Sequence, residues 1–365
     1  MAIIWADNFD NYGTTVANML DGIYAEAGVT LIADPDAGSS GNVIRLTRST
    51  TDTGAPFLDI SVLRKIYNSG LTTAGGSFRY YTPTLPNNNN QLVGFRLSDS
   101  NNVPHISVRL LTTGALEVTR GEYAPTNLSG TPGTIIGTSS AVITTSAWNH
   151  IEWKVVLSDT VGTVELRVNG VSVLSLTGQD TINAAAPGTI DQVSLTSGVT
   201  TGSQPVFDYF KDLILWDTTG TQNNDFLGTN HVYSLLPDAD STLTWTPSTG
   251  LTGFNLIDET DPNDADFISA ADPPPAQSEF TLTNLPPDIV GVKALIPVVR
   301  ARKIDGGDGS IQVGVKGTLT DLGADRPITS AFTYWWDVSE LSPDTGVAWT
   351  PVEVDAVKLT INRTV

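Results

Sequence analysis

Four aspartates in one short stretch are the best candidates in this chain for holding a metal ion. Asp258, Asp261, Asp264 and Asp266 lie close together among Thr, Pro, Asn and Ala residues. Calcium binds several oxygens at once, and loops of this composition supply them. The spacing differs from that of an EF-hand, and Asp is also frequent in solvated turns. We therefore consider both a calcium site and a solvated loop here, and expect no other cofactor.

The aromatic run Tyr334, Trp335 and Trp336 is the candidate binding site. Side chains alternate along a strand, so Trp335 should point away from the face that holds its two neighbours. One face would then belong to the core, and the other would be an exposed platform for a sugar ring or a partner subunit. The alternative is that all three rings are buried between layers and at a subunit interface.

Residues suited to hydrolysis are scattered along the chain. A glycosidase needs two carboxyl groups at close range, whereas Glu117 and Glu152 each stand alone on a predicted strand. We expect both glutamates on solvated faces. His105, His150 and His231 are far apart in sequence and match no catalytic motif, although a Ser-His-Asp set assembled in space stays open. We therefore expect that the chain is not an enzyme.

Composition excludes several classes of partner. The 365 residues include 39 acidic and 19 basic side chains, a formal net charge of -20, so phosphate backbones would be repelled and nucleic acid is not expected. There is no cysteine, which rules out disulfides and thiolate metal sites. No stretch approaches the roughly 20 apolar residues of a membrane helix, so no membrane insertion is expected.

The elements that must position these residues are short strands. Residues 148–157 and 164–173 alternate apolar and polar side chains, and predict a β-hairpin that places Ile151, Trp153 and Val155 against Val164, Leu166 and Val168. Similar short segments recur between Gly, Asn, Pro and Asp clusters, which is typical of an antiparallel sandwich or jelly roll. Short helices are expected only near residues 16–27 and 352–357.

The strand pattern predicts two domains. Residues 1–220 form the first sandwich, which closes with the strand at residues 206–217. Residues 221–275 are a linker or the early strands of the second domain, and they end in a Pro-rich break at 272–275. Residues 276–365 form a smaller C-terminal β-sandwich.

Two resemblances follow from these segments. The hairpin at 148–173 is similar to the late hairpin of concanavalin A-like (laminin G-like) sandwiches, which implies an all-β, antiparallel jelly-roll fold followed by the smaller sandwich. The chain as a whole resembles virion structural proteins of tailed bacteriophages, at residues 7–13, 207–220, 223–228, 235–240, 245–248, 255–259, 342–350 and 354–357.

The second resemblance implies a function. It points to a non-enzymatic structural protein on the surface of a tailed phage particle, associated with the tail or a fibre and adhering to a host-surface glycan. Capsid decoration, as a cement or head-fibre protein, is the alternative within this class. From another class, the alternative is a carbohydrate-active enzyme or a soluble lectin. The implied partners are other virion proteins and further copies of the chain, with a trimer as one arrangement. The implied location is the virion, assembled in the cytoplasm of the host bacterium.

Overall fold

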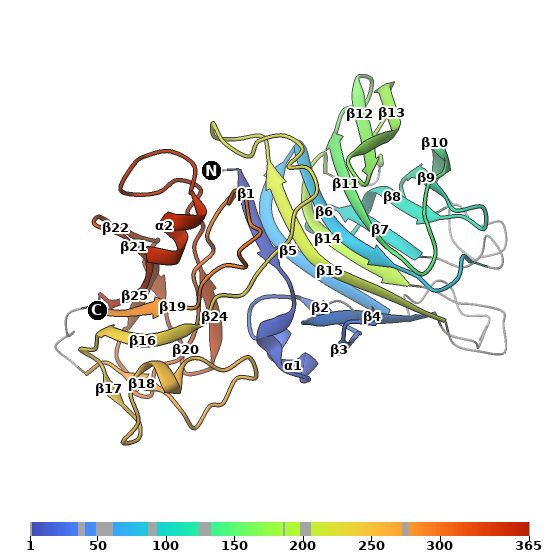
Figure 1. Cartoon of the computed structure of the whole chain (residues 1–365). Coiled ribbons are helices and arrows are strands. Elements are labelled where there is room, and N and C mark those ends of the chain that lie inside the picture. Colours follow the sequence, from blue (N-terminus) through green and yellow to red (C-terminus); the bar gives the residue numbers. More distant parts are fainter. Residues whose placement is uncertain are drawn as a thin grey trace.

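The computed structural model describes residues 2–35, 41–48, 61–86, 93–123, 133–184, 187–197, 206–271 and 277–364. The Pro-rich break at 272–275 lies outside this set. The described chain is almost entirely antiparallel β-structure, as predicted, and it forms two bodies (Figure 1). The larger body carries the blue-to-yellow part of the chain, and the smaller one carries the orange-to-red part.

The larger body is an antiparallel jelly-roll sandwich of two sheets. The eight-stranded sheet runs in the order β13 (Val171–Gln179), β12 (Gly162–Val168), β11 (Trp148–Val156), β6 (Thr73–Tyr81), β15 (Val206–Asp217), β4 (Asn42–Arg48) and β3 (Thr30–Ala33), with β1 (Ile3–Asp7) pairing with β15. The seven-stranded sheet runs in the order β10 (Thr134–Ala141), β9 (Ala115–Arg120), β8 (Pro104–Leu110), β7 (Val93–Ser98), β14 (Ile190–Ser197), β5 (Ser61–Leu71) and β2 (Glu26–Ala27).

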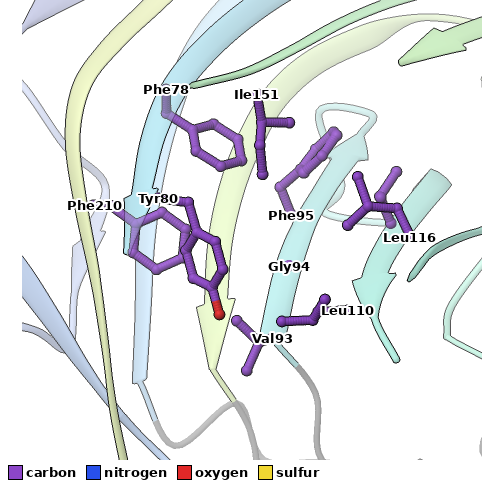
Figure 2. A pocket seen from close by; sticks show the side chains of 10 residues that line it. Phe78, Tyr80, Val93, Gly94, Phe95, Leu110, Leu116, Ile151 and Phe210 are labelled. Carbon is purple, nitrogen blue, oxygen red and sulfur yellow. The ribbon is translucent and has the colours of Figure 1, made fainter. Parts of the chain in front are cut away.

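The core of the sandwich lies between the inward faces of these sheets. Aromatic rings from both sheets meet there, with Phe78 and Phe95 5.5 Å apart and Phe95 stacked on Trp153 at 5.7 Å. A small apolar cavity of about 20 Å³ remains between the rings, and Figure 2 shows Phe78, Tyr80 and Phe210 along one side of it. A void of this size and lining stays dry, and we interpret it as a packing defect rather than a ligand site.

The predicted hairpin register is confirmed. Ile151 pairs with Val168, Trp153 with Leu166 and Val155 with Val164. The Asn169-Gly170 turn does not connect β11 to β12. It joins β12 to β13, which is the next connection along the chain. Both turn residues have positive φ (51° and 79°), as a type I′ turn requires.

The smaller body is a second, smaller β-sandwich. Its main sheet runs in the order β16 (Pro237–Thr242), β19 (Ser278–Leu282), β25 (Lys358–Arg363), β21 (Ser310–Lys316) and β22 (Thr320–Leu322), with β23 (Arg326–Pro327) pairing with β21. Two short sheets accompany it, β17 (Thr246–Pro247) with β18 (Ile268–Ser269) and β20 (Val298–Ala301) with β24 (Thr333–Trp336). Val299 and Trp335 of the β20–β24 pair pack on Phe280, Ile311 and Ile361 of the main sheet.

Helices are short. The α-helices are α1 (Val16–Met19) and α2 (Pro351–Ala356), and 3-10 turns occupy Asp10–Tyr12 and Phe254–Leu256. Thr350 and Glu353 form a capping box that starts α2, which is why a helix begins at this point. Within the described ranges, no helix has the length and apolar character needed to span a membrane.

The N-terminal strand joins the two bodies. Glu340 of the smaller body accepts hydrogen bonds from the backbone N–H groups of Ala2 and Ile3 at 2.8 and 3.0 Å. Beside this contact, Lys65 is only 1% exposed, with its Nζ 4.2 Å from the Trp5 ring and 4.1 Å from the Trp336 ring. Lys65 Nζ donates to the Ile23 carbonyl at 2.8 Å. Burial lowers the pKa of Lys65 to about 7.

Candidate functional site

The aromatic run identified from sequence lies at the junction of the two bodies. The Trp336 ring meets Trp5 at 4.8 Å, and the Tyr334 ring meets Tyr12 at 5.9 Å. Trp335 points the other way, into the core of the smaller body. The expected alternation is present, but both faces of β24 pack within the chain, so this strand presents no exposed platform.

The four candidate calcium ligands do not converge. Asp264 forms an ion pair with Arg300, and Asp266 accepts a hydrogen bond from Asn263 Nδ2 at 2.7 Å. Across the ranges that the structure describes, no three His, Asp or Glu side chains come together as a metal site would require. The residues present therefore do not fit a calcium ion.

Both glutamates expected on solvated faces are buried, which corrects that prediction. Glu117 is 6% exposed and forms an ion pair with Arg109 at 2.5 Å. Glu152 is 1% exposed. Alternation correctly directs both side chains away from the sandwich core, but other parts of the chain cover the outer faces on which they lie.

The outer face of the seven-stranded sheet, opposite the core, is polar but closed. Residues 121–123 lie across it, where Tyr123 OH is 2.8 Å from Thr196 Oγ1 and Glu122 forms an ion pair with Arg96 at 3.0 Å. The polar side chains beneath are buried; they include Ser98, His105, Thr119, Gln192 and Ser194.

The outer face of the eight-stranded sheet holds an accessible row of aromatic rings. Register places Tyr209 of β15 beside Tyr81 of β6, and Tyr81 beside Trp148 of β11. The ring centroids are 5.7 Å apart in the first pair and 5.6 Å in the second, and all three rings are half-buried. We call these three residues the aromatic row.

Polar partners fix the orientation of Trp148 at one end of the aromatic row. The indole Nε1 of Trp148 donates to Asp34 Oδ1 at 3.3 Å, and Lys211 Nζ lies 4.4 Å from the centroid of the Trp148 ring. Lys211 forms an ion pair with Asp34 at 2.5 Å. A ring held in this way is pre-organised to stack on a ligand.

A cluster of Asp212, His231 and Arg79 lies next to the aromatic row, with Asp212 on β15 and Arg79 on β6. A bulge in β15 between Lys211 and Ile214 puts Asp212 at a φ of 54°, an unusual conformation for a residue other than glycine. Asp212 Oδ2 is 3.1 Å from His231 Nδ1 and 3.5 Å from Arg79 Nε. His231 Nε2 is in turn 2.5 Å from an Arg79 terminal nitrogen. Asp212 is buried, whereas the side chain of His231 is 42% exposed.

His150 lies in the strand next to this cluster and is neutral. It is 3% exposed, and neither ring nitrogen has a hydrogen-bond partner among the described residues. Burial lowers its pKa to about 4, and the nearby Arg79 and His231 act in the same direction. A neutral imidazole at this position adds no positive charge to the site.

A segment of the link between the bodies forms one edge of the site. Residues 225–233, which we call the strap, follow β15 and cross the outer face of the eight-stranded sheet (Figure 1). Asp225 forms an ion pair with Lys154 at 2.9 Å, and the guanidinium of Arg167 lies 3.7 Å from the Phe226 ring centroid. The Gly228 N–H donates to Glu152 Oε1 at 2.9 Å.

The arrangement offers two kinds of chemistry. Three half-exposed rings in a line suit stacking against the apolar faces of sugar rings. An exposed histidine whose Nδ1 is held by a buried carboxylate suits general acid–base catalysis. The guanidinium of Arg79 adds hydrogen-bond donors beside the aromatic row and beside the histidine.

This site was missed from sequence because it is assembled from four separate segments, which carry Tyr81, Trp148, Tyr209 and His231. Two signals were present in the sequence. The alternation in 148–157 and 206–211 places Trp148 on the face opposite Ile151 and Trp153, and Tyr209 on the face opposite Phe210. Alternation alone does not say which strands pair, so it does not bring the rings together.

No family model matches the chain, and no curated protein matches it. Solved structures do match, at low similarity. They include the alginate lyase Aly36B, with 17% identity, 57% of this chain and 95% of that chain covered, and a TM-score of 0.39. The alginate lyase vAL-1 from Chlorella virus has 11% identity, with 54% of this chain and 91% of that chain covered and a TM-score of 0.39. An endo-1,3-beta-glucanase from Streptomyces sioyaensis has 14% identity, with 59% and 95% covered and a TM-score of 0.33.

These matches correct two predictions. The expectations of a non-enzymatic surface protein of a tailed phage and of a chain that is not an enzyme are both contradicted, because the matching structures named above are polysaccharide-acting enzymes. The virion resemblance itself, carried by segments such as 7–13 and 207–220, is tested by none of these matches and stays a prediction. At these identities and TM-scores the likeness concerns the fold, and the site must supply any functional argument.

Proposed function

We propose that the chain binds a polysaccharide along the aromatic row on the outer face of its eight-stranded sheet. The observation that carries this proposal is the alignment of Tyr209, Tyr81 and Trp148 across three neighbouring strands, with ring centroids 5.6 to 5.7 Å apart. The rings are half-buried, so they are held in place while one side of each remains accessible. A linear row of this kind suits an extended chain of sugars rather than a compact ligand.

Charge favours a neutral polysaccharide. Lys154, Arg79, Lys211 and Arg167 on this face are each paired with a carboxylate. The whole chain carries a formal net charge of -20, which repels a polyanion at long range. We therefore expect hydroxyl groups to be recognised by Arg79, His231 and the exposed Tyr233, with stacking on the aromatic row.

A binding assay with soluble polysaccharides tests this proposal. Calorimetric titration of neutral glucans and of uronate polymers should give binding to the neutral class, and Trp148→Ala should weaken it. Loss of one stacked aromatic ring is expected to reduce affinity roughly two- to tenfold. Phe267→Ala removes an exposed ring of the smaller body and is the matched control. Equal affinity of the parent chain and Trp148→Ala would contradict the proposal.

A second candidate function is cleavage of the bound polysaccharide, and the Asp212–His231 pair favours it. His231 is 42% exposed, Asp212 holds its Nδ1, and its Nε2 contacts Arg79, so a substrate would have to displace Arg79 from Nε2 before a proton is taken or given there. Strained backbone such as that at Asp212 is concentrated at functional sites. Incubation with the best-bound polysaccharide should release reducing ends, and His231→Ala should abolish the release while most of the binding, which the aromatic row carries, is kept. Binding without any change in polymer length would contradict cleavage and would favour a lectin.

A further inference from the structure

The strap is the part of the site with the fewest regular hydrogen bonds, yet it carries His231. It lies outside every strand, so other contacts must fix the position of its backbone. Asp225 and Phe226 at its start contact Lys154 and Arg167 through side chains that are partly exposed. Exposed ion pairs contribute little to rigidity. A stronger contact is needed near the histidine.

Glu152 provides that contact. Its carboxylate lies beneath the strap and accepts the Gly228 N–H, with Oε1 2.9 Å from the Gly228 nitrogen. Its burial raises its pKa, and the hydrogen bonds from Gly228 and Leu227 oppose that rise. Gly228 has a φ of 78°, and its carbonyl accepts a bond from Asn230 Nδ2 at 2.7 Å, so the backbone turns at the point where Glu152 holds it.

The distance along the chain links this contact to the site. His231 is three residues beyond Gly228, a span of at most about 10 Å of extended chain. Fixing Gly228 therefore restricts where the imidazole can lie. After the turn, the Val232 N–H donates to Asp212 Oδ1 at 3.3 Å, so Asp212 holds the far side of His231.

We propose that Glu152 is a positioning residue: by accepting the Gly228 N–H, it fixes the strap so that His231 meets Asp212 and Arg79. The inference rests on the proposed function for its biological purpose, because the cluster that it orders is the polar part of the polysaccharide site. The positioning itself is a property of the protein without ligand. Glu152 does not contact the sugar in this account, since it is covered by the strap.

Nuclear magnetic resonance on the whole chain without saccharide tests the positioning. Glu152→Ala should speed hydrogen exchange of the Gly228 amide by roughly ten- to a hundredfold, the effect of losing a hydrogen bond to a charged acceptor. It should also shift the ring resonances of His231. Glu152→Gln should restore both, because its amide oxygen still accepts the Gly228 N–H. Glu165→Gln alters a carboxylate of the next strand that pairs with Arg167, and it should change neither signal.

A second variant is needed in case Glu152→Ala does not fold. Gly228→Pro removes the N–H and cannot adopt the observed positive φ, so it releases the strap with Glu152 intact. It should shift the His231 ring resonances as Glu152→Ala does. Unchanged His231 resonances in the variant that folds would overturn the proposal. Because no saccharide is present, this result is independent of whether the polysaccharide proposal fails.

Discussion

His231 Nδ1 lies 3.1 Å from Asp212 Oδ2, although the two residues come from a loop and from a bulge in a strand. The bulge turns the Asp212 carboxylate onto the outer face of the eight-stranded sheet, where the strap brings the imidazole to meet it. The contact joins the link between the two bodies to the strand that closes the sandwich.

Removing the Asp212 carboxylate should destabilise the protein. Asp212→Ala leaves Arg79 partly buried without its carboxylate and places a Cβ-bearing residue without a compensating hydrogen bond at a positive φ. The free energy of unfolding should fall by about 2–4 kcal/mol, since breaking a largely buried ion pair costs more than a surface pair. Chemical denaturation measures this loss. Asp217→Ala, at the half-buried end of the same strand, removes hydrogen bonds from Thr219 and is the control; it should cost less.

Lys65 should make stability depend on pH above neutrality. Its pKa is lowered to about 7 in the folded chain, whereas the ordinary value is 10.5. Between these values the unfolded chain binds a proton at this lysine that the folded chain does not, so the free energy of unfolding should rise with pH. The slope from one such group is at most about 1.4 kcal/mol per pH unit.

The groups that face Lys65 are Asp7 and the rings of Trp5, Tyr24 and Trp336. Burial raises the pKa of Asp7 above its usual 3.8, so the contribution of Asp7 to stability falls as the pH rises, opposite in sign to that of Lys65. Lys65→Met should remove the rise in stability above pH 7, as measured by denaturation at several pH values. A surface substitution, Lys154→Met, should leave that rise in place. A slope unchanged by Lys65→Met would contradict the assignment.

His150 should destabilise the fold in mild acid. Its pKa is lowered from 6.5 to about 4, so between these values the unfolded chain binds a proton that the folded chain does not. The free energy of unfolding contributed by this group therefore falls as the pH drops from 6.5 towards 4. His150→Leu removes the titrating ring at a buried position and should flatten this part of the stability curve. His231→Leu, which replaces an exposed histidine, is the variant with which His150→Leu is compared.

Substitution of Gly170 in the Asn169-Gly170 turn should destabilise the protein. Gly170 has a φ of 79°, and a residue with a Cβ is strained there although space is available around it. Gly170→Ala should lower the free energy of unfolding by about 1 kcal/mol. Gly250→Ala introduces a methyl group into open space without a positive φ and should have little effect. Thermal melting of both variants gives the comparison.

The sequence was sufficient for the fold because its signals are local. Ile151, Trp153 and Val155 alternate with polar residues, and this pattern determines both the strand and its buried face. Burial of Glu152 could not be predicted in the same way, because the strap that covers it lies more than seventy residues later, at Gly228. Nor does the sequence state that a bulge at Asp212 would turn a second consecutive side chain onto the outer face.

The aromatic run at Tyr334 shows the opposite failure. Its alternation was predicted correctly, but local pattern cannot show that a strand of one body will pack against the N-terminal segment of another. Trp336 meets Trp5, and Tyr334 meets Tyr12, more than three hundred residues away. Long-range docking of this kind depends on shape, which composition does not encode.

The central claim, polysaccharide binding along the aromatic row, is tested most directly by following tryptophan indole N–H resonances during titration with a neutral oligosaccharide. The Trp148 resonance should move, because its ring belongs to the row and its N–H is bonded to Asp34. The resonance of Trp153, fully buried in the core, should stay in place. Saturable binding that leaves Trp148 unmoved, or that moves Trp335 or Trp336 instead, would contradict the account.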